Sequence, residues 1–188
     1  MLTERFSQAI TLAIEAHTNQ KRKGTEIPYI SHPLGVASIA LEYGADEDQA
    51  MAALLHDAIE DGGQEYAQRI RLQFGDRVAN IVEGCTDGVP NANGEKEAWK
   101  PRKERYLDHL KHASEDVLLV SGSDKLHNAR AIVDDLVRIG PAVFDRFTAS
   151  QEQTLWYYDS LSKIFTERKM PIAKALIDTV YRMKILAN

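Results

Sequence analysis

Apolar side chains recur at helical spacing along nearly the whole chain. Near the start, the i, i+3, i+4 pattern places one apolar stripe along a helix, formed by Phe6, Ala9, Ile10, Ala13 and Ile14. Similar segments follow, separated by glycines and polar loops, and no internal repeat or linker-like shift in composition divides the chain. The pattern predicts one all-α domain, a bundle of about eight to ten helices.

Turn and capping signals set the expected helix boundaries. The first helix runs out near Asn19, and the others are expected at 31–43, 46–61, 64–74, 76–87, from Pro101 onward, 124–139, 141–147, 150–168 and 171–186. The apolar run 117–120 resembles a short strand, but its helical neighbours favour a buried helical turn. Residues 84–100 contain three glycines and a proline, which predicts a long surface loop.

Composition narrows the class of protein. Cys85 is the single cysteine, which excludes a disulfide within the chain, and the first six residues lack the basic and apolar pattern of a secretory signal. No stretch approaches the roughly 18 apolar residues of a membrane helix. We therefore expect a cytoplasmic protein without a membrane partner.

Lys and Arg number 23 against 28 Asp and Glu, so the net charge of −5 argues against nucleic acid as a partner. The oligomeric state is left open.

An acidic cluster with an imidazole stands at the end of an apolar helical segment. At about 100° per residue, His56 and Glu60 share one face, while Asp57 and Asp61 share the adjacent face. Three carboxylates crowded at the negative end of a helix repel one another unless a cation joins them. The alternative is a solvated acidic helix end, which the apolar run 51–55 disfavours. The cluster favours a metal site.

One helix rarely completes a coordination shell, so further ligands are expected elsewhere. His32 lies in the first turn of a predicted helix, and Asp124 opens another. Taken alone, His32 is as compatible with a capping or core histidine, and Asp124 with a helix N-cap. These alternatives stay open on spacing alone.

The chain contains the H…HD…D signature, formed in order by His32, the pair His56-Asp57 and Asp124. That order resembles the HD-domain metal-dependent phosphohydrolases. The signature by itself is only moderately specific, and further motifs narrow it.

Three further stretches make the resemblance specific: the pair Glu60-Asp61, the segment Arg22–Pro33 and the block Asp124–Arg130. Together they resemble the hydrolase domain of RelA/SpoT proteins and the stand-alone small alarmone hydrolases. The resemblance covers most of residues 3–165. It implies a single HD hydrolase domain, an all-α helical bundle, over residues 1–188.

The resemblance also implies roles for individual residues. Four of them are implied ligands of one divalent metal, usually Mn²⁺ in this family: His32, His56, Asp57 and Asp124. By the same resemblance, Glu60 and Asp61 orient and deprotonate the attacking water. Arg22 and Lys23 would meet the substrate phosphates, and Asn128 would contact the nucleotide.

The implied activity is removal of the 3′-pyrophosphate from guanosine tetra- or pentaphosphate, (p)ppGpp, giving GDP or GTP and pyrophosphate. A related phosphohydrolase acting on another nucleotide is the first alternative: an adenosine alarmone, the 2′-phosphate of NADPH or a nucleotide monophosphate. A non-catalytic nucleotide-sensing module is the second, although degenerate HD domains typically lose ligands or the acid pair, which are all present here.

Several features are not assigned by the resemblance. Four residues, 24–27, lie between Lys23 and Pro28 where many relatives have three, and the aromatic run 156–158 matches no particular position. The basic residues of 100–105 form either a second basic rim or a solvated helix face. His127 is expected to pack or hydrogen-bond near Asp124. The remaining histidines, at 17, 109 and 112, are expected to be surface or satisfied core groups.

Overall fold

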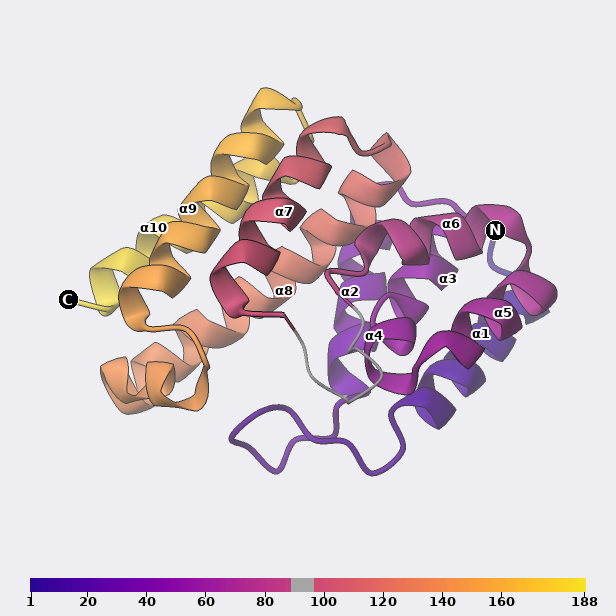
Figure 1. The fold of residues 1–188 in the computed structure, drawn as a ribbon, viewed down its shortest axis with the longest axis horizontal. Coiled ribbons are helices and arrows are strands. Elements are labelled where there is room, and N and C mark those ends of the chain that lie inside the picture. The colour runs from indigo at the N-terminus through magenta and orange to yellow at the C-terminus, as the bar shows by residue number, and fades with distance from the viewer. Residues whose placement is uncertain (89–96) are drawn as a thin grey trace.

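The computed structural model describes residues 1–88 and 97–188, and within them the secondary structure is helical (Figure 1). The elements are α1 (Glu4–Ala16), α2 (Ser31–Glu42), α3 (Glu47–Leu55), α4 (Ala58–Gly62), α5 (Gln64–Phe74), α6 (Asp76–Cys85), α7 (Trp99–His112), α8 (Glu115–Ile139), the 3₁₀ helix η1 (Gly140–Arg146), α9 (Gln151–Glu167) and α10 (Ala173–Leu186). The described ranges thus hold ten α-helices, which confirms the predicted all-α bundle.

Two of the helices begin at reciprocal capping boxes. Before α3, the Asp46 side chain accepts the N–H of Gln49 at 2.9 Å, and the Gln49 side chain accepts the N–H of Asp46 at 2.8 Å. Ser150 and Gln153 form the same reciprocal box before α9. These caps satisfy N–H groups that a helix start otherwise leaves without partners.

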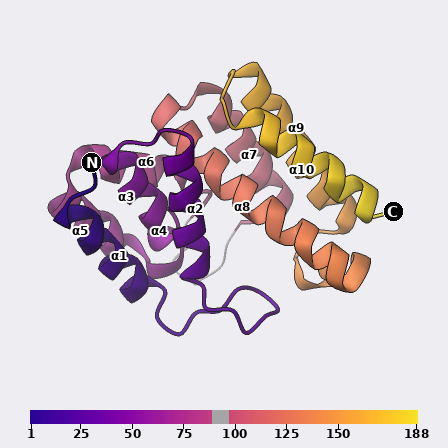
Figure 2. The same cartoon turned by 180° about the vertical axis from the view of Figure 1, so that it is seen from behind.

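Helix α8 is the centre of the bundle. Figure 2 shows it between α2 on one side and the α9–α10 pair on the other, and it packs against both α2 and α10. Its buried residues include Leu118, Val120 and Leu126. The close approach of α10 requires Gly122, where a Cβ would lie 2.8 Å from Cγ2 of Ile172.

Several expected boundaries were wrong. The run 117–120 is helical, as expected, but it belongs to α8, which begins at Glu115 rather than 124. The helix expected at 141–147 is the 3₁₀ helix η1, Gly140–Arg146. The first helix ends at Ala16, and α7 begins at Trp99, before Pro101. Of the expected loop 84–100, the first two residues end α6 and the last two begin α7; residues 89–96 lie outside the described ranges.

The expected helix 46–61 is also interrupted. Helix α3 ends at Leu55 and α4 begins at Ala58, so His56 and Asp57 lie in the turn between them. The His56 ring Nδ1 lies 2.8 Å from the carbonyl oxygen of Ala53. In a regular helix that oxygen accepts the N–H of the residue four positions on. The side chain therefore competes with the backbone at this point, and no glycine or proline signals it.

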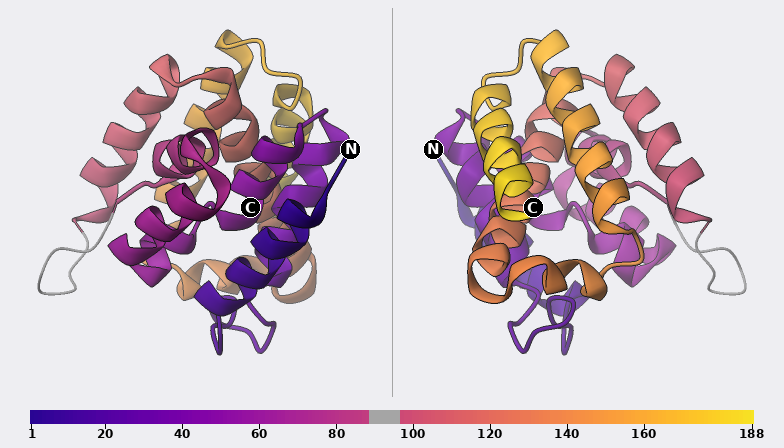
Figure 3. Two further views of the ribbon diagram at one scale, coloured as in Figure 1. Left: turned by 90° about the vertical axis from the view of Figure 1, so that its right-hand side faces the viewer. Right: turned by 90° about the vertical axis from the view of Figure 1, so that its left-hand side faces the viewer.

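The loop between α1 and α2 is closed at its base. An isolated bridge joins Lys21 to Pro28, and backbone bonds run from Arg22 N to Ile27 O at 2.8 Å and from Tyr29 N to Gln20 O at 2.9 Å. Helix α2 starts two residues after Tyr29. The loop hangs below the helices in both views of Figure 3. Its tip touches η1, where a Cβ on Gly24 would lie 2.6 Å from Cδ of Arg146.

Among the described residues, no helix combines the length and the apolar character needed to span a membrane.

Candidate metal centre and adjoining cleft

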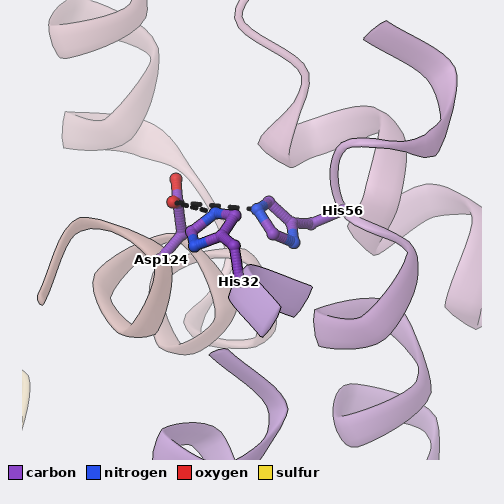
Figure 4. A group of neighbouring side chains, drawn as sticks. All are labelled: His32, His56 and Asp124. Atoms are coloured by element: carbon purple, nitrogen blue, oxygen red, sulfur yellow. Dashed lines mark ion pairs between the residues drawn. The ribbon is translucent and has the colours of Figure 1, made fainter. Parts of the chain in front are cut away.

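Three of the expected ligands meet between α2, α3 and α8. In Figure 4 the side chains of His32, His56 and Asp124 point toward one another. Nε2 of His32 lies 3.1 Å from Oδ1 of Asp124, and Nε2 of His56 lies 3.7 Å from the same oxygen. One donor atom of each lies within 4.8 Å of the others, and all three residues are buried.

Asp57 borders this group. Its Oδ2 lies 3.0 Å from Nε2 of His56 and 3.5 Å from Nε2 of His32. The same oxygen accepts a hydrogen bond from the Tyr29 hydroxyl at 2.7 Å. The structure thus brings all four expected ligands together, from α2, α8 and the turn after α3.

The donors suit a divalent cation. Nδ1 of His56 donates to the carbonyl of Ala53, so the proton of the neutral ring is on Nδ1 and Nε2 carries a lone pair. Nε2 of His56 is buried without a hydrogen-bond partner. A buried imidazole nitrogen facing two carboxylates is the environment that a cation satisfies. Mixed nitrogen and oxygen donors are compatible with Mn, Fe, Co or Zn.

The electrostatics of the site lead to the same conclusion. Burial opposes charge on His56, but the carboxylates of Asp57 and Asp124 outweigh it and raise the pKa of His56 well above its ordinary value. Burial likewise disfavours charge on Asp124, yet the ammonium group of Lys125 and the two histidines hold the pKa of Asp124 well below its ordinary value. A proton on Nε2 of His56 and a cation occupy the same position, so the two compete.

Asp124 is held by two neighbours on its own helix. Nζ of Lys125 donates to its Oδ2 at 2.5 Å, and Nδ2 of Asn128 donates to its Oδ1 at 2.6 Å. The Asn128 carbonyl oxygen in turn accepts from Nη2 of Arg22 at 2.6 Å. A chain of hydrogen bonds therefore connects Arg22 on the loop to the metal centre through Asn128.

A cleft of about 500 Å³ lies beside the centre. Its described walls carry six basic side chains: Arg22, Lys23, Arg102, Lys103, Lys125 and Arg146. Aromatic side chains also line it, among them Trp99, Tyr157 and Tyr158. The carboxylates of Glu60 and Asp135 also line it, so basic side chains outnumber acidic ones by six to two although the chain has a net charge of −5, and this excess suits a polyanion.

The expected acid pair is divided between two environments. Glu60, on α4, lines the cleft. Asp61 is bonded to the loop instead: its Oδ2 accepts from Nε2 of Gln20 at 2.9 Å and lies 3.8 Å from Nδ1 of His17. Both carboxylates come from the short helix that directly follows His56 and Asp57, which keeps them near the centre.

Comparison with known proteins agrees with this geometry. A family model described as an HD domain matches residues 9–153. The chain belongs to the HD-domain family. It is 42% identical over 137 residues to the Xenopus tropicalis protein named guanosine-3′,5′-bis(diphosphate) 3′-pyrophosphohydrolase MESH1, a match that covers 71% of this chain and 70% of the relative.

Two further relatives extend the comparison of this HD-domain chain. An Aquifex aeolicus guanosine-3′,5′-bis(diphosphate) 3′-pyrophosphohydrolase is 39% identical over 131 residues, which span 69% of this chain and 18% of the longer relative. A solved structure described as a metazoan ortholog of SpoT that hydrolyzes ppGpp superposes with a TM-score of 0.77 at 23% identity, covering 99% of this chain and 98% of that one. That likeness concerns the fold. The resemblance to RelA/SpoT-type hydrolases seen in the sequence is confirmed.

Several residues around the HD-domain centre were missed by sequence reasoning. Tyr29, Lys125 and Arg146 were given no role, although Tyr29 and Lys125 bond directly to expected ligands and Arg146 lines the cleft. The sequence signal that could have identified Lys125 is its position directly after the expected ligand Asp124. Arg146 comes from η1, and nothing in the sequence relates it to the loop.

For two other basic residues the sequence allows either a basic rim or a solvated helix face. Arg102 and Lys103 line the cleft and pair with the buried carboxylate of Asp87, with 2.8 Å from Nη1 of Arg102 to Oδ2 of Asp87. They are not part of a solvated face. Arg105 pairs with the exposed Glu97. His127 lies next to the centre, as expected, with its Nδ1 at 2.9 Å from Nδ1 of His32.

Proposed function

We propose that this chain is a Mn²⁺-dependent hydrolase that removes the 3′-pyrophosphate of (p)ppGpp, giving GDP or GTP and pyrophosphate. The observation that carries the proposal is the juxtaposition of the HD-type ligands with a cleft lined by six basic side chains. The names of the relatives at 42% and 39% identity support the same substrate. We place the activity in one HD domain.

The proposed ligands are His32, His56, Asp57 and Asp124. A divalent cation held there supplies Lewis acidity to the phosphoryl group under attack. The ligands themselves are held in place by surrounding bonds, such as that from Tyr29 to Asp57. Mn²⁺ is proposed because this family usually carries it, and the donor set accepts it.

We assign proton transfer to the carboxylate of Glu60, which lines the cleft. The water oxygen bonds to the phosphorus attached to the ribose 3′ oxygen, the bond from that phosphorus to the 3′ oxygen breaks, and the 3′ oxygen takes up a proton. Glu60 accepts the proton lost by the water. Asp61, fixed by Gln20, helps to orient that water. Precise placement of such groups lowers the barrier by removing unproductive orientations.

The basic side chains of the cleft neutralise the remaining phosphates of the substrate. Arg22 and Lys23 lie on the loop, and Lys103 and Arg146 approach from α7 and η1. We assign the contact with the nucleotide to Asn128, which lines the cleft and bonds to Asp124. Aromatic walls offer flat surfaces on which a purine base stacks. A phosphorylated nucleotide substrate and a single buried cysteine fit a cytoplasmic location.

Incubation of the purified protein with Mn²⁺ and ppGpp tests the proposal, with GDP and pyrophosphate as the expected products. Glu60→Gln is the matched control: it keeps the shape of the side chain, and we expect it to retain metal while turnover falls by about 10²–10⁴-fold. Absence of turnover in wild-type protein with metal analytically present would refute the proposal. A parallel panel contains NADPH, an adenosine alarmone and a nucleotide monophosphate. If one of these is hydrolysed in preference to ppGpp, it is the substrate instead.

A further inference from the structure

His127 lies behind the proposed metal ligand His32. Their Nδ1 atoms are 2.9 Å apart, and their ring centroids are 4.8 Å apart. At this separation one nitrogen carries the proton and the other accepts it, because two N–H groups or two lone pairs would repel. Nε2 of His32, on the opposite side of its ring, lies 3.1 Å from Oδ1 of Asp124. His32 therefore presents one nitrogen to the metal centre and the other to His127.

Metal binding decides which ring is the donor. A cation requires the lone pair of Nε2, and a neutral imidazole with that lone pair carries its proton on Nδ1. The shared proton then belongs to His32, and Nδ1 of His127 accepts it. His56 shows the same arrangement, with the carbonyl of Ala53 at 2.8 Å behind its Nδ1. At His32 the acceptor is a side chain, which substitution can remove.

The two helices hold the His127 ring in place. Gly35 lies one turn after His32 on α2, and a Cβ there would lie 2.3 Å from both Cδ2 and Nε2 of His127. His127 lies one turn after Asp124 on α8, on the same side of the helix. The absence of a side chain at Gly35 therefore provides the space that the second imidazole fills.

We propose that His127 is a positioning residue: it accepts the Nδ1 proton of His32 and keeps the Nε2 lone pair of His32 directed at the cation. This inference rests on the proposed function only for the presence of a divalent metal. His127 also borders the cleft. The competing account, a direct contact with the nucleotide, predicts weaker substrate binding with unchanged metal affinity.

The test measures the Mn²⁺ dissociation constant without nucleotide, by following free Mn²⁺ with electron paramagnetic resonance. His127→Phe keeps a ring, excludes water and removes the acceptor, and we expect the dissociation constant to rise about 10–100-fold. His127→Asn offers an amide oxygen near the position of Nδ1 and is expected to restore affinity to within about threefold. His109→Phe is the matched control, because His109 bonds to the carbonyl of Gly84, outside the centre.

Melting of each metal-free variant separates loss of folding from loss of affinity. If His127→Phe does not fold, Gly35→Ala replaces it, since it displaces the His127 ring without removing a nitrogen, and the same rise is expected. An unchanged dissociation constant in the folded variant overturns the inference, as does an Asn variant as weak as the Phe variant. Hydrolysis of ppGpp is assayed separately. Wild-type protein that binds Mn²⁺ without hydrolysing ppGpp refutes the proposed function alone.

Discussion

Asp124 serves as counter-ion to a lysine as well as a proposed ligand, so its removal has a measurable cost even without metal. In Asp124→Ala, the Lys125 ammonium loses the carboxylate that lies 2.5 Å away. Breaking a buried pair costs about 3–5 kcal/mol, and we take about 3 kcal/mol because the Lys125 side chain retains 12% exposure. Asp57→Ala is the matched control, because both variants remove one carboxylate from beside His32 and His56. Beyond that shared loss, Asp57→Ala leaves the Tyr29 hydroxyl without its acceptor, a cost of about 1 kcal/mol, and leaves no lysine unpaired.

Urea unfolding in EDTA measures both variants without a contribution from metal. We expect Asp124→Ala to unfold about 2 kcal/mol more easily than Asp57→Ala, with equal m-values, and to melt about 4–8 °C lower. Adding Lys125→Met to Asp124→Ala removes the uncompensated charge and is expected to recover about 2 kcal/mol of the loss. Equal stability of the two single variants, or a double variant no more stable than Asp124→Ala, would show that the ion pair contributes no such stabilisation.

Two further outcomes are expected. Arg168 donates to carbonyls at the C-terminal end of α7, at 3.1 Å to Leu110 O, 2.8 Å to Lys111 O and 2.9 Å to Ala113 O. Arg168→Ala is therefore expected to lower the free energy of urea unfolding by about 2 kcal/mol without changing Mn²⁺ affinity. Unchanged stability would contradict this capping role. Removal of metal by EDTA is expected to lower the melting temperature. Adding Mn²⁺ at about 100 times its dissociation constant is expected to restore about 2.7 kcal/mol of stability, which corresponds to roughly 5–11 °C in melting temperature. His56→Ala should show no such shift, and a wild-type protein indifferent to Mn²⁺ would argue against the metal centre.

Much of the fold was accessible from the sequence because helical periodicity and caps are local signals. The capping box at Asp46 and Gln49 is an example, since both partners lie within four residues. The break after Leu55 was not accessible. It depends on the ring of His56 bonding to the carbonyl of Ala53, a choice that the burial of His56 against α2 and α8 favours over a regular helix. Tertiary contacts therefore overrode a sequence with strong helical character.

The candidate site was likewise predictable from the sequence only in part. His32, His56, Asp57 and Asp124 were recognised from their residue types and order, and the structure brings them together. Some of their supporting partners come from segments far away in the chain: Tyr29 bonds to Asp57, 28 residues on, and His127 bonds to His32, 95 residues before it. Such partners have no fixed spacing, and a tyrosine or a histidine is equally compatible with ordinary packing. Only the folded chain distinguishes these roles.

Because the loop between α1 and α2 is closed at its base, this protein can tolerate changes in the sequence of the loop. The bridge from Lys21 to Pro28 fixes both ends of the segment, so the chain enters Tyr29 and then His32 along a path independent of what lies between. Insertions or deletions at the tip, residues 24–26, are therefore absorbed locally, as long as the contact of Gly24 with Arg146 is replaced. The tip is the part of this molecule where natural variation or a designed graft alters the rim of the cleft while the ligand geometry stays constant.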